Sequence, residues 1–200
     1  ALQVEGVEKI ILDLRGNSVG RVQEGIELAN LFLSNGAIVS LKGRQHGEEN
    51  FEADADSTVT DLPLALISDR ATAGSAELVA AALLDNKRAQ LVGERTYGLA
   101  ALQKTIEFED GTALILSVAK YHRPAGEALQ DGGVTPSHPL SPMEVRRYRE
   151  WRYAVDTNTP TPSGHLGVDS VGKDGIEKDP YIEKALEALK TPLTPERKAA

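Results

Sequence analysis

Leu64–Gln103 decides the fold of this chain and reads LALISDRATAGSAELVAAALLDNKRAQLVGERTYGLAALQ. It contains a short apolar run, a turn of small residues, a helical pattern from Glu77 to about Asn86, and a second apolar run, Ala89–Val92. Apolar runs that alternate with a helix are typical of an α/β protein. We therefore expect a mixed β-sheet with flanking helices.

The turn before this helix has the composition of a site for a negatively charged group. Its residues are small, and Gly74 permits backbone angles that other residues avoid. The free N–H groups and the positive dipole end of the helix point into it, which suits an oxyanion or a carboxylate. Ser75 is either a nucleophile on a strand-to-helix turn or, like Thr72, only a helix cap that Glu77 completes.

Further motifs accompany this turn in a fixed order along the chain. They read Leu12-Asp13-Leu14-Arg15-Gly16-Asn17, Asp85-Asn86-Lys87-Arg88-Ala89, Leu91 to Gly98, Ala119-Lys120-Tyr121, Pro124-Ala125-Gly126 and Gly133-Val134-Thr135-Pro136. Together they resemble the catalytic core of the C-terminal-processing (tail-specific) serine peptidases, whose fold is related to ClpP and crotonase. The resemblance covers roughly residues 5–140 and implies a ClpP/crotonase-like core.

The resemblance implies a serine nucleophile and a lysine base, and this chain has neither at the matching positions. Aligned on Glu77, the nucleophilic serine of the family's Ser-Ala-Ser-Ala-Ser-Glu turn falls on Gly74, and the family's lysine falls on Leu99. Glycine has no side chain, and leucine cannot accept a proton. The family's assisting glutamine is kept as Gln103. We therefore expect a degenerate Ser/Lys dyad.

The oxyanion-hole turn implied by the resemblance reads Ser18-Val19-Gly20, where the family has Pro-Gly-Gly. The backbone N–H of Val19 can still donate a hydrogen bond, because this role requires no particular side chain. We expect Val19, Gly20 and Ser75 to form the oxyanion site. Ser75 and Gln103 are the remaining candidates for catalysis.

Two lysines near Gln103 are poor replacements for the missing base. Lys104 follows Gln103 directly, so on a strand its side chain points to the opposite face. Lys120 lies at a strand end, where a salt bridge is the more usual role.

Two other polar positions have a functional and a structural interpretation. Arg15 would either clamp a peptide carboxylate or anchor its loop through backbone carbonyls, and we favour the anchor. His46 with Glu48 and Glu49 suggests a metal site, but a solvated hairpin or loop is favoured because no further residue with ligand spacing accompanies them.

Composition excludes several classes of function. The net charge of −8 and the pI near 5.1 argue against a general grip on nucleic acid. The absence of cysteine excludes disulfides and thiol catalysis. No apolar run reaches the length of a membrane span and no signal peptide is visible. The chain opens in mid-pattern at Ala1, so we expect a piece of a longer protein, and we expect no cofactor.

The remaining elements follow from periodicity and turn residues. We expect the end of a helix at residues 1–5, strands at Val7–Leu14 and Ala37–Leu41, a helix at Val22–Leu33, and a β-hairpin of Ala101–Phe108 with Thr112–Ala119 around Asp110-Gly111.

The composition changes after Pro136, and we expect a core domain of residues 1–140 and a C-terminal extension of residues 141–200. The extension would hold a helix at Met143–Tyr153, a flexible linker at Thr157–Lys173 and a closing helix at Asp179–Leu189.

Two functions from different classes remain open. One is a serine endopeptidase that uses Ser75 in a shifted register. The other, which the loss of both dyad residues favours, is a pseudo-peptidase that binds peptides in the same groove. A crotonase-like acyl-CoA enzyme is a remoter option, against which the order of the motifs argues.

The resemblance also implies partners and a location. It implies binding to protein C-terminal peptides, an extracytoplasmic (periplasmic or secreted) location and a possible homo-oligomer. The PDZ-like module usual in the family is not in these residues.

Overall fold

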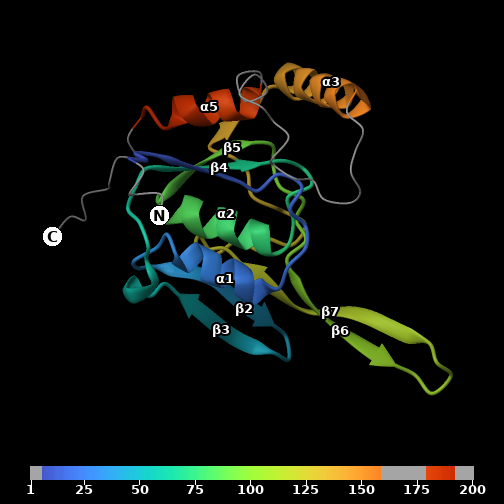
Figure 1. Ribbon diagram of the computed structural model, residues 1–200. Helices are drawn as coiled ribbons and strands as arrows, with labels where there is room; N and C mark the ends of the chain where they lie inside the picture. Colours follow the sequence, from blue (N-terminus) through green and yellow to red (C-terminus); the bar gives the residue numbers. More distant parts are fainter. Residues whose placement is uncertain (1–5, 159–178, 192–200) are drawn as a thin grey trace.

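The computed structural model describes residues 6–158 and 179–191, and two sheets organise them (Figure 1). The first sheet is parallel, with the order β1-β4-β5-β8. Its strands are β1 (Ile10–Asp13), β4 (Leu64–Ser68), β5 (Ala89–Gly93) and β8 (His138–Pro139). The second sheet is antiparallel, with the order β3-β2-β7-β6. Its strands are β2 (Ala37–Gly43), β3 (Gly47–Glu52), β6 (Ala101–Glu107) and β7 (Ala113–His122).

Helices cover both faces of the parallel sheet. They are α1 (Val22–Asn30), α2 (Ser75–Asp85), α3 (Pro142–Asn158) and α5 (Pro180–Ala188), with a short 3-10 turn, η2 (Ala55–Ser57). The α/β class, the Asp-Gly hairpin and the two C-terminal helices predicted from the sequence are confirmed. The expected helix end at residues 1–5 and most of the expected linker lie outside the described residues. None of the described helices has the length and apolar character needed to cross a membrane.

Two predicted elements are shorter than expected. The first strand begins at Ile10 and not at Val7, because its partner among the described strands, β4, begins at Leu64, which lies opposite Ile10. Helix α1 ends at Asn30, three residues before the predicted Leu33. The carbonyl of Leu33 accepts a hydrogen bond from the Thr58 hydroxyl in place of a following helical turn.

Strand β4 is buried on both faces, and its alternate residues enter two different cores. Leu64 and Leu66 pack into the core shared with α1, α2 and the antiparallel sheet. Ala65 and Ile67 pack on the other side, in the core that includes residues of α5. This alternation follows from the period of two in a strand, and it explains why the run carries no polar residue until Ser68.

Helix α2 lies between the two sheets, which makes it the centre of the fold (Figure 1). Its residues from Ser75 to Leu83 are all buried, as the all-round apolar pattern predicts. Gly25 of α1 permits the close crossing of the two helices, because a Cβ there would stand 2.7 Å from the Ser75 carbonyl oxygen. The burial of this helix fixes the position of the turn at its N-terminus.

The C-terminal helices are tied to the sheet through Arg15. Its guanidinium donates to Asp13 and, at 2.8 Å, to Asp179, the N-cap residue of α5. It also lies over the rings of Tyr148 and Tyr181, at 5.0 and 4.8 Å from their centroids. Arg15 is therefore an anchor, as favoured, although carboxylates and rings hold it in place of the expected backbone carbonyls. The division after residue 140 stays a prediction.

The expected hairpin around His46 is present, formed by β2 and β3. No group of three or more His, Cys, Asp or Glu residues among residues 6–158 and 179–191 could hold a metal ion.

Arg88 joins backbone segments of the core through hydrogen bonds from its side chain. It donates to the backbone carbonyls of Phe32, Thr60 and Leu62 at 2.8–3.1 Å, and burial lowers its pKa. Arg88→Ala would leave three carbonyls without these donors, so we expect a loss of about 2–3 kcal/mol in the free energy of unfolding. Urea denaturation measures it. Arg147→Ala, on the exposed face of α3, is the control and should stay within about 0.5 kcal/mol.

Candidate active-site cradle

The candidate site lies where β4 passes through a turn, residues 69–74, into α2. Two hydrogen bonds hold this turn against the loop after β1: the hydroxyl of the buried Thr72 donates to the Leu14 carbonyl, and the Ala73 N–H donates to the Asn17 carbonyl, both at 2.9 Å. A strand, a tight turn and a helix in succession form the arrangement that presents a nucleophile at the top of a sheet in α/β hydrolases.

Gly74 occupies the N-cap of α2 with φ 63° and ψ −126°. Residues other than glycine rarely adopt this backbone conformation because it is strained for them. Where they do adopt it, the residue often lies in a functional site. Nothing blocks a side chain here, since the heavy atoms nearest to a Cβ would be the Ser18 carbonyl oxygen at 3.8 Å and the Leu99 carbonyl oxygen at 3.9 Å. The backbone therefore keeps the geometry and the space of a strained nucleophile position, while glycine relieves the strain.

Leu99 lies beside Gly74, as the alignment of the two motifs requires. Its carbonyl oxygen is 3.9 Å from the place where a Cβ on residue 74 would lie, and its side chain is 45% exposed. The two positions that the resemblance assigns to nucleophile and base are thus neighbours in space. Neither carries a group that titrates or attacks a carbonyl.

The buried carboxylate of Glu77 holds these two positions together. Its Oε2 accepts from the backbone N–H of Gly74 at 3.1 Å and of Leu99 at 2.8 Å, and its Oε1 accepts from the Gly98 N–H at 2.7 Å and from the Thr96 hydroxyl. The Thr96 oxygen in turn accepts from the Val134 N–H. Four donors on one buried carboxylate fix the distance between the turn and the segment that carries residue 99.

This role of Glu77 goes beyond the sequence prediction, which treated it only as a capping residue. The signal was present, because Glu77 is the one charged residue between Ser75 and Leu84 in an otherwise apolar helix. A fully buried carboxylate requires several donors. Its partners lie about twenty residues further along the chain, so the helix pattern could not name them.

The predicted oxyanion residues come together at the N-terminus of α2. The Ser75 hydroxyl is 3.4 Å from the Val19 carbonyl oxygen, to which it donates. Gly20, with φ 119°, has little room for a side chain, because a Cβ would stand 3.0 Å from the Ser75 hydroxyl oxygen, which would have to move. Within the described residues, the backbone N–H groups of Val19 and Ser75 have no hydrogen-bond acceptor. Backbone N–H groups without an acceptor are the kind of donor that an oxyanion site requires.

We call residues 19, 20, 74, 75 and 99 the cradle, and Gln103 is the catalytic candidate that does not belong to it. Gln103 is exposed on β6, opposite Ser117, and makes no hydrogen bond to the cradle within residues 6–158 and 179–191. Lys120 forms a salt bridge to Asp131 at 3.6 Å, as predicted. Ser75 is buried, and no histidine, lysine or carboxylate of the described chain hydrogen-bonds to its hydroxyl.

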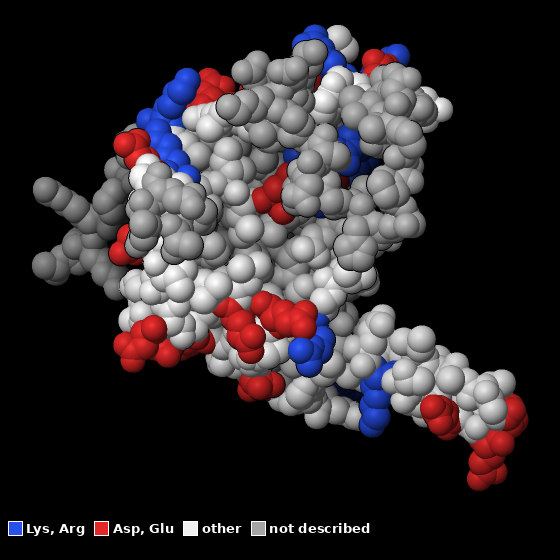
Figure 2. Space-filling model, in the orientation of Figure 1, with Lys and Arg blue, Asp and Glu red and all other residues white. Residues whose placement is uncertain are grey.

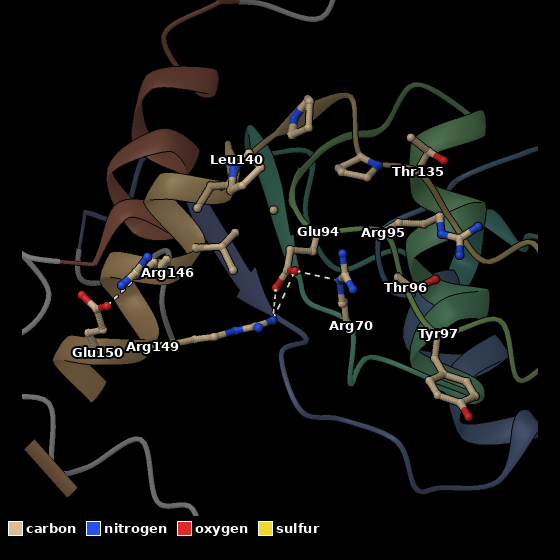
Figure 3. A pocket seen from close by; sticks show the side chains of 15 residues that line it. Arg70, Glu94, Arg95, Thr96, Tyr97, Thr135, Leu140, Arg146, Arg149 and Glu150 are labelled. Atoms are coloured by element: carbon tan, nitrogen blue, oxygen red, sulfur yellow. Dashed lines mark hydrogen bonds and ion pairs between the residues drawn. The ribbon is translucent and has the colours of Figure 1, made fainter. Parts of the chain in front are cut away.

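A pocket of about 770 Å³ lies between α3 and the segment after β5 (Figure 3). Glu94 stands in it and accepts from Arg70 at 3.0 Å, Arg149 at 3.3 Å and the Tyr181 hydroxyl at 2.9 Å. Burial, together with the hydrogen bond to Glu94, raises the pKa of Tyr181. The cradle residues 19, 20, 74, 75 and 99 do not line this pocket. The paired charges make it a junction between α3, α5 and the sheet.

The fold and the cradle place a helix N-terminus at a strained turn with backbone N–H groups beside it, which is the scaffold that hydrolases of the strand-turn-helix type use. Residues 1–140 match the model of Peptidase family S41, and the chain belongs to this family.

Similarity to individual proteins agrees with the match to this family. The chain is 40% identical over 140 residues to carboxyl-terminal-processing peptidase 2, chloroplastic, of Arabidopsis thaliana, covering 70% of this chain and 27% of the relative. It is 34% identical over 170 residues to carboxy-terminal processing protease CtpA of Bacillus subtilis, covering 84% and 35%. The chain thus spans about a third of the length of these relatives.

Solved structures agree. The photosystem II D1 C-terminal processing protease superimposes with a TM-score of 0.64 at 34% identity, covering 70% of this chain and 36% of that one. An S41 protease from Bacteroides fragilis has the same TM-score at 18% identity, over 94% of this chain and 46% of that one, and shares the fold.

Proposed function

We propose that this chain is a catalytically impaired member of the C-terminal-processing peptidases that binds protein C-terminal peptides. The observation that carries the proposal is the pair Gly74 and Leu99, which lie beside each other in space and carry neither a nucleophile nor a base. Acyl transfer requires a nucleophile and a group that accepts its proton. Peptide binding requires neither, and the N–H groups of Val19 and Ser75 are sufficient to receive a carboxylate.

The surface around the cradle favours peptides with apolar residues near the C-terminus. Three apolar side chains on the loops that form it are exposed: Val19 at 80%, Leu99 at 45% and Tyr97 at 65%. Exposed apolar groups of this size beside free N–H donors suit a carboxylate preceded by apolar side chains. We also propose an extracytoplasmic location, which rests on the resemblance to the processing peptidases alone.

The alternative, an active endopeptidase using Ser75, has less support. The Ser75 hydroxyl already donates to the Val19 carbonyl, and no proton acceptor on a side chain is joined to it within the described residues. A serine without an adjacent base is a weak nucleophile.

Peptide binding without cleavage tests the proposal. Fluorescent peptides of about ten residues, ending in Leu-Ala-Ala with a free carboxylate, should bind the protein, and mass spectrometry should find them uncut after incubation. C-terminally amidated copies are the control and should bind about tenfold more weakly, since they lack the charge. Gly20→Val should also weaken binding, because a side chain at this φ is strained and would displace the Ser75 hydroxyl. Equal affinity for acid and amide, or cleavage, would contradict the proposal.

A further inference from the structure

The β6–β7 hairpin projects from the body of the protein as an arm, which we define as residues 103–117 (Figure 1). Strand β2 pairs with β7 only at Lys120, Tyr121 and His122. Beyond that point, each strand of the arm pairs with the other and with no further strand of the described chain. An isolated two-stranded hairpin is marginally stable in water, so the arm is a candidate for contact with another chain.

The register of the hairpin separates its side chains into two unlike faces. Ile106 pairs with Leu114 and Lys104 with Leu116, and because side chains alternate, these four point to one face. Thr105 pairs with Ile115 and Glu107 with Ala113, on the opposite face. The first face, extended by Phe108, is called the apolar face of the arm.

The apolar face is open to solvent. The exposed fractions of Ile106, Phe108, Leu114 and Leu116 are 37, 51, 45 and 47%. Side chains of this size on one face of a sheet are normally covered, since each contributes about 1.5–3 kcal/mol when it is fully buried.

Charge is distributed unevenly along the arm. Lys104 stands on the apolar face near the root and forms no ion pair within the described residues. Glu109 and Asp110 stand at the tip, and Figure 2 shows acidic side chains gathered there, with basic ones nearer the root. The Asp110 carboxylate accepts from Thr112, whereas the Glu109 side chain has no such partner among the described residues.

We propose that the apolar face of the arm is the interface of a symmetric dimer, in which two arms lie antiparallel with these faces in contact. A two-fold axis in the plane of contact, at the level of Ile106 and Leu114, would place Phe108 of each arm over the Lys104–Leu116 pair of the other. The same rotation would bring Lys104 near the root of one arm beside Glu109 at the tip of the other.

The charge pattern is what selects a second copy of this chain as the occupant. In a two-fold contact, residue i meets residue j and j meets i, so a surface with a cation at one end and an anion at the other is complementary to itself. A single lysine on an exposed apolar strand pair also guards against open-ended aggregation. If protection against aggregation were the only role of Lys104, the protein would be monomeric, and sedimentation would show it.

Sedimentation velocity of the whole chain at concentrations from about 1 to about 100 µM measures its self-association. We expect a dimer whose dissociation constant rises at least about tenfold in Leu114→Asp, because a charge would enter the centre of the contact. Ile115→Asp is the matched control, since it lies at the neighbouring position on the opposite face, and it should leave the dimer unchanged. Thermal unfolding should show that both variants remain folded.

Charge reversal tests the register independently of the apolar contact. Lys104→Glu alone places two glutamates together at each end of the interface, and Glu109→Lys alone places two lysines there, so each variant should dimerise less well than the natural chain. An equimolar mixture of the two variants should form a heterodimer, because every contact then joins opposite charges. A monomeric natural protein, a dimer insensitive to Leu114→Asp, or a mixture that stays monomeric would each overturn the proposal.

Discussion

The double variant Gly74→Ser/Leu99→Lys is expected to react with a fluorophosphonate probe at residue 74 and to cleave peptides that the natural chain leaves intact. The turn already holds residue 74 at φ 63° and ψ −126°, and a Cβ there would meet nothing closer than 3.8 Å. Because Glu77 fixes the neighbouring backbone of Leu99, a lysine at that position would start close to the new hydroxyl. A positioned base contributes about 10²–10⁴-fold, so we expect at least about a hundredfold gain in hydrolysis.

The single variants are the controls for this gain. Gly74→Ser alone introduces the hydroxyl without its base, and Leu99→Lys alone introduces the base without a nucleophile, so both should stay near the background. The serine at position 74 should also cost about 1–3 kcal/mol of stability, since an L-residue is strained at this φ. A folded double variant that neither binds the probe nor cleaves peptide would show that the cradle lacks catalytic geometry.

Glu77→Ala is expected to give the largest loss of stability of any single substitution described here, about 4 kcal/mol or more. The substitution removes a fully buried carboxylate and leaves the donors of Gly74, Thr96, Gly98 and Leu99 without an acceptor. Each buried donor that stays unsatisfied costs about 1–3 kcal/mol, and the four costs are partly shared. The turn and the segment around Leu99 should separate, so peptide binding should be lost as well.

Urea unfolding of Glu77→Gln and Glu187→Ala completes this test. The amide of glutamine keeps one acceptor oxygen, so Glu77→Gln should lose about half as much stability as Glu77→Ala. Glu187 is exposed on α5, and its removal should change stability by no more than about 0.5 kcal/mol. A Glu77→Ala protein as stable as the Glu187→Ala control would mean that Glu77 does not hold the cradle together.

The central fold was predictable because its signals are local. The buried strand at Leu64–Ser68, the apolar helix after it and the Asp-Gly hairpin each follow from patterns of a few residues. The limits of β1 and α1 were harder to predict, because a partner strand beginning at Leu64 and a hydroxyl from Thr58 set them. Such partners are distant in the sequence.

The sequence predicted which residues of the candidate site lie close together, but it did not predict the hydrogen bonds that hold them there. The neighbourhood of Gly74 and Leu99 followed from a family motif, and the contact of Ser75 with Val19 and Gly20 from the expected oxyanion turn. The bonds from Glu77 to residues 96, 98 and 99 require the folded chain. The roles of Ser75 and Gln103 in chemistry, and of Val19, Gly20 and Ser75 as an oxyanion site, stay predictions.

The most direct test asks whether the natural protein has a reactive serine. The protein is treated with a fluorophosphonate, and intact-mass and peptide mass spectrometry then locate any adduct. The account predicts no adduct on any serine under conditions in which Gly74→Ser/Leu99→Lys is fully modified. An adduct on Ser75 of the natural chain that disappears in Ser75→Ala would contradict it and establish a working hydrolase.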